Sequence, residues 1–399
     1  MSDAPFIDAL RGAARTTPES GIVRVMNHAR ESGKPFIPLS AGEGHLPTPE
    51  FICAPAHAAL TAGETFYTYQ KGLPELREAL STYHKRYFDR DLPSQRFIIT
   101  GSGMQAIQLT IQAIAGEGDE VLLPTPAWPN FAAALGVMGA KPVPVAMDLQ
   151  NGVWSLDNGK LARAITSKTK AIFINSPCNP TGWTAELEQL ADILKLARER
   201  DLWIIADEVY SRFFYGESKG RSSHRSASFY DLIDEDDKII FVNTFSKNWA
   251  MTGWRVGWIS APPQLEQVFE NLVQYSTSGV SAFMQRGAVA ALNEGDDFTG
   301  QMVANCKIGR DILCDALAKC SGVRFERPRG AFYLFLGLDK YPDTSELGLR
   351  LVDDTALVMS PGEAFGDAGA GFLRLCFARD HSDIHIAAER LTNWISTHQ

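Results

Sequence analysis

Short apolar runs alternate with amphipathic segments through the middle of the chain. The runs that resemble buried strands lie at residues 97–100, 120–123, 171–174, 202–206 and 239–242. The Gly-rich stretch GSGMQA at 101–106 leads into a helix with apolar periodicity, and a second helix is expected at about 185–200. Apolar strands separated by amphipathic helices predict a parallel sheet that is covered on both faces.

The pattern changes after about residue 290. A long helical stretch runs to Lys319, and strand-like segments such as YLFLGL and FLRLCFA then alternate with helices up to Thr397. Strands mixed with flanking helices indicate a separate α+β domain. The first 50 residues are too few to fold alone. We therefore expect a large domain at 51–290 and a smaller one formed by 1–50 together with 291–399.

Polar residues that could carry chemistry follow the predicted strands. GSGMQA, Asn179, Asp207 and Lys247 each come shortly after one of them. In open α/β sheets, ligands bind outside the carboxyl ends of the strands, so these groups are expected to meet at one edge. Lys247 has apolar neighbours, which makes it a candidate for a lowered pKa and for covalent amine chemistry.

Each of these motifs is only moderately specific when taken alone. GSGMQA offers backbone N–H groups at a helix N-terminus, which suits a phosphate, but Ala106 stands where the dinucleotide fingerprint has its last glycine. Asn179 sits in the rigid loop NSPCNPTG, from which its amide can point into a cleft. Asp207 ends a buried strand and needs a partner there, whereas Glu208 is expected to cap the segment that follows.

Composition narrows the function classes. A net charge of −9 disfavours sequence-independent nucleic-acid binding, and the spacing of the six cysteines matches no zinc motif. The N-terminal residues lack the pattern of a signal peptide, and no apolar run approaches the ~18 residues of a membrane-spanning helix. We expect a cytoplasmic protein with reduced thiols and no metal site.

Three motifs in this order and spacing resemble those of a known family: N-S-P-C-N-P-T-G at 175–182, D-E-V-Y at 207–210 and S-K-N-W-A-M-T-G-W-R-V-G at 246–257. They resemble fold-type I enzymes that use pyridoxal 5'-phosphate (PLP), and among them the class I/II aminotransferases. The resemblance covers nearly the whole chain. It implies an α/β fold, with a mainly parallel seven-stranded sheet covered by helices in the large domain and a smaller α+β domain beside it. It also implies a cytoplasmic homodimer with shared active sites.

The resemblance assigns the cofactor shell. Lys247 would form an aldimine with PLP and later move a proton, and Asp207 would pair with the pyridine nitrogen. A charge pair at about 4 Å is worth about 4 kcal/mol at an effective dielectric constant of 20, or roughly three pK units. The other residues implied to contact the cofactor are Asn179 and Tyr210 at the ring oxygen, Trp128 on the ring face, and Gly103, Met104, Gln105, Thr244, Ser246, Arg255 and the partner's Tyr67 at the phosphate.

The resemblance also implies how the substrates bind. An L-amino acid and a 2-oxo acid (2-oxoglutarate, oxaloacetate or pyruvate) would react in turn in a ping-pong cycle. Arg374 would bind the α-carboxylate, with Asn179, Trp128 and Gly42 beside the substrate. The stretch VQYSTSGVSAFMQR has no arginine before Arg286, so the partner of a second carboxylate is missing, and strict aspartate specificity is in doubt. Possible substitutes are Lys71, His45 and Arg24.

Three alternatives remain on the sequence alone. A PLP-dependent β-lyase acting on cysteine-type substrates would share the cofactor shell, because the reaction type depends on residues on the substrate side. A regulator built on this fold would usually carry a DNA-binding helix-turn-helix, and the first 50 residues are not basic. A nicotinamide dehydrogenase would need an acidic residue for the ribose, which is absent at the expected distance.

Overall fold

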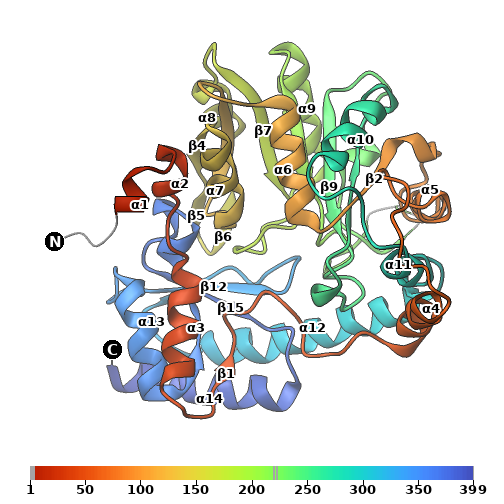
Figure 1. Cartoon of the computed structure of the whole chain (residues 1–399). Helices are drawn as coiled ribbons and strands as arrows, with labels where there is room; N and C mark the ends of the chain where they lie inside the picture. The colour runs from red at the N-terminus through yellow and green to blue at the C-terminus, as the bar shows by residue number, and fades with distance from the viewer. Residues whose placement is uncertain (1–4, 219–220, 222, 399) are drawn as a thin grey trace.

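A seven-stranded sheet forms the centre of the protein in this computed structural model, which describes residues 5–218, 221 and 223–398 (Figure 1). The strands lie in the order β2-β10-β9-β8-β7-β3-β4. All neighbours are parallel except β10, which runs antiparallel to both β2 and β9. Their bounds are β2 (Phe97–Thr100), β3 (Glu120–Thr125), β4 (Lys141–Ala146), β7 (Thr169–Asn175), β8 (Trp203–Asp207), β9 (Ile239–Thr244) and β10 (Gly257–Ser260). The predicted α/β fold with a mainly parallel sheet is confirmed.

The inner strands are mainly apolar because both faces of the sheet are covered. In β7, Phe173 belongs to one apolar cluster, whereas Ile172 and Ile174 belong to another on the opposite face. The first face packs against α6 (Gly103–Ile114), α7 (Pro129–Met138) and α10 (Glu266–Gln274), and the ring of Phe131 in α7 stacks on Phe173 with centroids 3.7 Å apart. The second face packs against α5 (Pro74–Phe88), α8 (Asn158–Ala164) and α9 (Leu187–Glu199).

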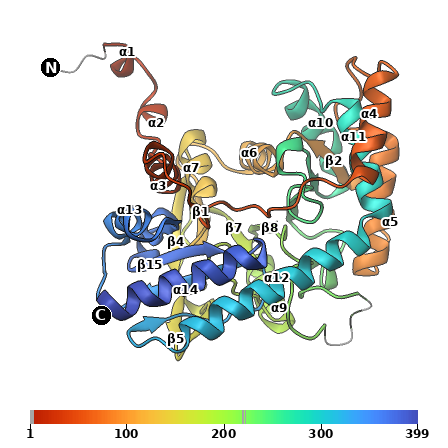
Figure 2. The same cartoon turned by 90° about the horizontal axis from the view of Figure 1, so that it is seen from below.

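Further helices lie at one end of the sheet. Helix α4 (Glu50–Thr61) packs along α11 (Ala282–Glu294), which also contacts α5, and Figure 2 shows these three helices together. A two-stranded hairpin of β5 (Asp148–Gln150) and β6 (Val153–Ser155) follows β4. Within the described residues, no helix is both long enough and apolar enough to cross a membrane.

The C-terminal part has its own sheet and its own apolar cluster. The strands β11 (Val323–Arg324), β12 (Tyr333–Leu338), β15 (Phe372–Cys376) and β14 (Ser360–Pro361) form an antiparallel sheet in this order. Helices α12 (Asp296–Leu317) and α14 (His381–His398) lie side by side beneath it, as Figure 2 shows, and α13 (Thr344–Thr355) packs next to β14.

The N-terminal segment begins with α1 (Pro5–Asp8) and α2 (Gly12–Arg15). Helix α2 contacts α7 beside the seven-stranded sheet, whereas the segment from α3 to β1 packs on the C-terminal part. Helix α3 (Gly21–Glu31) contacts α13, and β1 (Ile37–Pro38) pairs in parallel with β13 (Leu357–Val358). Val25 and Ala29 share a small apolar cluster with residues of the C-terminal part. These contacts support the proposal that 1–50 and 291–399 form one domain beside a large domain at 51–290.

Candidate active site

A cavity of about 460 Å³ opens at the carboxyl ends of β7, β8 and β9. Most of the residues predicted from the sequence line it together: Gly42, Gly103, Met104, Trp128, Asn179, Asp207, Tyr210, Thr244, Ser246, Lys247, Arg255 and Arg374. They come from positions more than 300 residues apart in the chain. The predicted convergence of polar groups at this edge of the sheet therefore occurs in the structure.

Lys247 follows β9 and extends toward the N-terminal segment. Its Nζ donates a hydrogen bond of 2.7 Å to the carbonyl oxygen of Gly42. Burial lowers the pKa of Lys247 from its usual value to about 8, and the positive charges of Arg374 and Arg255 act in the same direction. The lowered pKa increases the fraction of neutral amine near neutral pH, and the neutral form is the one that covalent amine chemistry requires.

Asp207 is the last residue of β8 and is buried at the floor of the cavity. Its carboxylate accepts a long hydrogen bond of 3.4 Å from the backbone N–H of Val209, and no described cation forms an ion pair with it. Burial raises the pKa of Asp207 to about 7. A buried carboxylate in this state suits a cationic atom of a ligand, which would stabilise its charged form.

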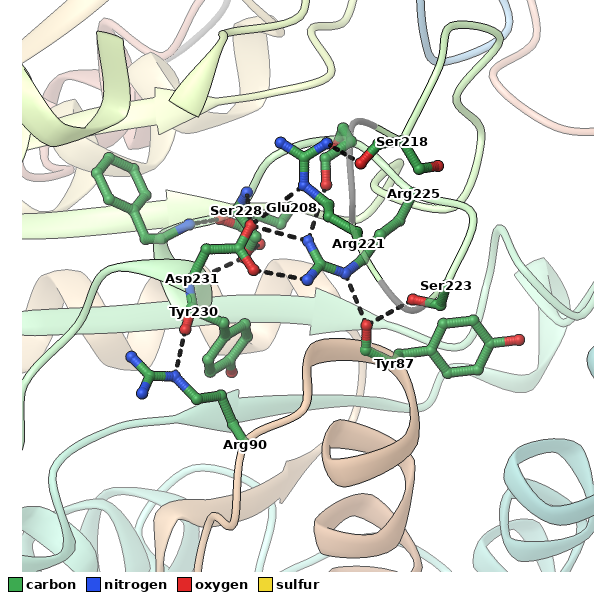
Figure 3. A network of polar contacts seen from close by, with 12 residues as sticks. Tyr87, Arg90, Glu208, Ser218, Arg221, Ser223, Arg225, Ser228, Tyr230 and Asp231 are labelled. Carbon is green, nitrogen blue, oxygen red and sulfur yellow. Dashed lines mark hydrogen bonds and ion pairs between the residues drawn. The ribbon is translucent and has the colours of Figure 1, made fainter. Parts of the chain in front are cut away.

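Glu208, the next residue, is not part of the cavity lining and belongs to a polar network (Figure 3). Its carboxylate accepts hydrogen bonds from the hydroxyl of Ser228 and from the backbone N–H of Phe229. Nearby, Arg225 pairs with Asp231. Glu208 was expected to cap the segment directly after it, but it binds the start of a 3-10 helix about 20 residues further on. These hydrogen bonds connect the residue that follows β8 to the start of the 3-10 helix at Phe229–Asp231.

The N-terminus of α6 and the end of β9 form a cradle of donors. Ser102 caps the helix by accepting a hydrogen bond of 3.1 Å from the backbone N–H of Gln105. The hydroxyl of Thr244 donates to that of Ser246 at 2.9 Å. A side chain at Gly257 would bring its Cβ to 2.7 Å from the Gly103 nitrogen, so glycine is needed where β10 meets the helix. Backbone donors, hydroxyls and the nearby Arg255 suit a phosphate.

Two of the predicted site residues do not line the cavity. The backbone N–H of Gln105 is used by Ser102, and its side-chain amide donates to the hydroxyls of Ser276 and Thr277 at 3.0 Å each. Gln105 therefore supports the N-terminus of α6 through contacts outside the cavity. Tyr67 is 91% exposed and lies outside the cavity of its own chain.

Arg374, in the middle of β15, is held so that part of its guanidinium stays free. One terminal nitrogen donates to the side-chain oxygen of Asn179 at 3.0 Å, and the other donates to the backbone oxygen of Ser40. Its Cζ lies 4.7 Å from the centre of the Tyr333 ring. Its Nε is buried and has no hydrogen-bond partner. A buried guanidinium with an unused donor suits the carboxylate of a ligand.

Comparison with known proteins agrees with this arrangement. The sequence model of the family "Aminotransferase class I and II" matches residues 34–391. The chain belongs to this family. It is therefore an aminotransferase, and the expected resemblance is confirmed over most of the chain.

Its relatives include aminotransferases of differing names. A "Probable aspartate/prephenate aminotransferase" of Aquifex aeolicus is 35% identical over 371 residues, covering 91% of this chain and 92% of that protein. Among solved structures, an "Alanine aminotransferase from Pyrococcus furiosus" has a TM-score of 0.90 at 26% identity, covering 97% of this chain and 100% of that one. An aspartate aminotransferase from Thermus thermophilus with maleate has a TM-score of 0.88 at 29% identity, covering 96% and 99%.

The aminotransferase cavity also contains residues that were not among the predicted site residues. The hydroxyl of Tyr333 lies 2.8 Å from that of Tyr210, and burial raises the pKa of both phenols. Ser40 supplies the backbone oxygen that holds Arg374, and Asn175 donates to the backbone oxygen of Asp207 at 3.1 Å. The signal for Tyr333 was its place in the apolar strand YLFLGL, where a phenol needs a partner.

Proposed function

We propose that the protein uses pyridoxal 5'-phosphate to transfer an amino group from an L-amino acid to a 2-oxo acid by a ping-pong mechanism. The observation that carries this proposal is that Lys247 and Asp207 line one cavity, the first with an amine of lowered pKa and the second with a buried carboxylate that forms no ion pair with a described residue. The matching family and its named relatives support the same reaction.

The described residues fit the cofactor. Pyridoxal phosphate, when bound, supplies an aldehyde that reacts with amines and a ring that withdraws electrons from the substrate Cα. Asp207 would keep the pyridine nitrogen protonated, and this cationic nitrogen would give the buried carboxylate the ion-pair partner that the described residues do not provide. The phosphate would be held by Gly103, Met104, Thr244, Ser246 and Arg255 around the N-terminus of α6.

Other side chains would orient the ring and the substrate. Tyr210 and Asn179 would bind the ring oxygen, and Trp128 would cover a ring face. Arg374 would bind the substrate α-carboxylate through its free donor, since Asn179 and Ser40 already fix the rest of its guanidinium. Lys247 would accept the proton from the substrate Cα with its neutral amine and pass it to the C4′ carbon of the cofactor, and the second half-reaction would use the same transfer in reverse.

We also propose that the protein is a homodimer with shared active sites. Large aromatic side chains are exposed near one another in sequence: Phe66 is 83% exposed, Tyr67 91% and Tyr69 57%. Exposed apolar side chains of this size favour contact with another protein surface, here a second copy. Tyr67 would then reach the phosphate of the partner's site. Light scattering should give twice the chain mass, and a fully active monomer would contradict the proposal. A cytoplasmic location remains a prediction from the sequence.

The reaction can be tested with a donor labelled with ¹⁵N at its amino group. Incubation with the protein, pyridoxal phosphate and a 2-oxo acid should yield the ¹⁵N-labelled amino acid of the acceptor in amounts equal to the donor consumed. The relatives do not favour the β-lyase alternative. A lyase would release labelled ammonia and need no acceptor, so ammonia without labelled product would contradict an aminotransferase.

A further inference from the structure

Two phenols from different parts of the fold meet in the site cavity. Tyr210 lies in the turn after β8, and Tyr333 is the first residue of β12. Both line the cavity and both are buried. Their hydroxyl oxygens lie 2.8 Å apart, and their rings meet edge to face with centroids 5.6 Å apart. A hydrogen bond inside the site therefore joins the end of the large sheet to the C-terminal part.

The direction of this hydrogen bond follows from the number of donors. A phenol has one hydrogen to donate and two lone pairs that can accept. Under the proposed function, Tyr210 gives its hydrogen to the charged ring oxygen of the cofactor. The contact of 2.8 Å is then a hydrogen bond only if Tyr333 is the donor. Among the described residues, Tyr210 is the hydrogen-bond partner of the Tyr333 hydroxyl, so no other acceptor competes for this hydrogen there.

Tyr333 is able to keep both its hydrogen and its position. Burial raises the pKa of Tyr333 and of Tyr210, so both phenols stay protonated near neutral pH. A Cβ at Gly42 would lie 2.9 Å from the Tyr333 hydroxyl oxygen, so the backbone of the N-terminal segment lies directly against this oxygen. The guanidinium carbon of Arg374 lies 4.7 Å from the centre of the Tyr333 ring. These contacts hold the hydroxyl against Tyr210.

A donor to Tyr210 changes the hydrogen bond that Tyr210 itself donates. A hydroxyl whose oxygen accepts a hydrogen bond is a stronger donor, and bonds in such a chain strengthen one another by about 10–30% each. We propose that Tyr333 is a positioning residue that acts through Tyr210: it donates to the Tyr210 hydroxyl and so strengthens the hydrogen bond from Tyr210 to the ring oxygen of the cofactor. The inference rests on the proposed function and adds a residue to the same site.

This chain of hydrogen bonds has a measurable consequence for protonation. The negative charge of the ring oxygen needs a donor most when the nitrogen of Lys247, once attached to the cofactor, carries no proton to share with that oxygen. Tyr333 therefore favours the loss of this proton. Both phenols belong to one chain, so the effect is independent of the residues that a second subunit contributes.

The test is a pH titration of the cofactor absorbance in the holoenzyme without substrate. Tyr210→Phe removes a hydrogen bond to a charged oxygen and should raise the pKa of this titration by about one to two units. Tyr333→Phe removes the hydrogen given to Tyr210 but keeps the ring beside Arg374. We expect it to raise the pKa by about 0.3 unit, the share that polarisation contributes.

The double variant distinguishes action through Tyr210 from an independent effect. If Tyr333 acts through Tyr210, its hydroxyl has nothing to strengthen once Tyr210 is phenylalanine. The titration of the double variant should then match that of Tyr210→Phe within about 0.1 unit. An equal shift from Tyr333→Phe in both backgrounds would overturn the proposal, and so would the absence of a shift in the wild-type background.

Tyr215→Phe is the matched control. The Tyr215 hydroxyl donates to the backbone oxygen of Ala331, two residues before Tyr333, and Tyr215 is not part of the cavity lining. Loss of this hydroxyl is the same chemical change beside the same strand, and it should leave the titration in place. An equal shift in Tyr215→Phe and Tyr333→Phe would assign the effect to loosened packing of β12 and overturn the proposal.

The same experiment separates this inference from the proposed function. A protein that shows no absorbance of a lysine-bound cofactor at any pH would overturn the proposed function. KM for the amino acid gives a second readout, because Tyr333→Phe keeps the ring beside Arg374 and should change KM by less than about twofold. A tenfold rise in KM with an unshifted titration would assign Tyr333 to carboxylate binding and overturn its action through Tyr210.

Discussion

The amine of Lys247 donates a hydrogen bond of 2.7 Å to the backbone oxygen of Gly42, which lies 205 residues earlier in the chain. This contact joins the end of β9 to the segment that connects β1 with α4. The same segment supplies the backbone oxygen of Ser40 that holds Arg374. The N-terminal segment therefore supplies hydrogen-bond acceptors to both Lys247 and Arg374, although it is remote from them in sequence.

Gly42 tests the importance of this segment. A Cβ at this position would lie 2.9 Å from the hydroxyl oxygen of Tyr333, which must then leave its place 2.8 Å from the Tyr210 hydroxyl. We expect Gly42→Ala to lower kcat/KM about tenfold, as for overpacking that costs about 1–3 kcal/mol. Gly44→Ala is the matched control, because its Cβ would make an ordinary contact of 3.7 Å. Equal losses of kcat/KM in the two variants would contradict a specific effect of the contact between residue 42 and Tyr333.

Asp207 is expected to act through its charge. Asp207→Asn keeps the shape of the side chain but removes the carboxylate that would pair with the pyridine nitrogen. A charge pair of about 4 kcal/mol at close range corresponds to about a thousandfold in rate, so kcat should fall by at least about a hundredfold. Steady-state kinetics give kcat, and circular dichroism checks that the fold is retained. An unchanged kcat would mean that the ring nitrogen has another partner.

Arg374 is expected to act in binding. Arg374→Lys keeps one positive charge but loses the planar fork that contacts Asn179 and Ser40. We expect KM for the amino acid and for the 2-oxo acid to rise about tenfold or more, with the absorbance of the bound cofactor unchanged. A changed cofactor spectrum with unaltered KM would assign Arg374 to the cofactor instead.

Glu208 gives a prediction for stability against pH. Burial raises its pKa to about 7 in the folded protein, above the value of about 4.5 for an unfolded glutamate. Between these two pH values the folded state holds the proton more tightly, so the contribution of Glu208 to stability falls as pH rises through this window, by up to about 3 kcal/mol. Glu208→Gln removes this dependence. The free energy of unfolding of the variant should therefore gain on the wild type between pH 4.5 and 7.5; a constant difference would contradict the raised pKa.

Part of the fold could be predicted from the sequence because burial on both faces leaves unbroken apolar runs. β7, β8 and β9 were predicted for this reason. β4 was not, because KPVPVA lies at the edge of the sheet and is only partly buried. β10 was not predicted because GWIS has only two large apolar residues, between a glycine and a serine, and nothing local indicates its antiparallel direction.

The site could be predicted where chemistry sits at a strand end, as for Asp207. It could not be predicted where a contact depends on how distant elements pack. Tyr333 reaches Tyr210 only because β12 lies beside the turn after β8, and Gln105 faces inward because Ser276 and Thr277 offer hydroxyls there. The sequence motif around Gln105 does not determine the direction in which its side chain points.

Lys247 is proposed to hold the cofactor, and reduction of the loaded protein with borohydride can test this assignment. We expect the reduced cofactor to stay attached to one peptide, the one that contains Lys247, and we expect Lys247→Ala, loaded and reduced in the same way, to carry none. Attachment to another lysine, or no attachment in the wild-type protein, would contradict it.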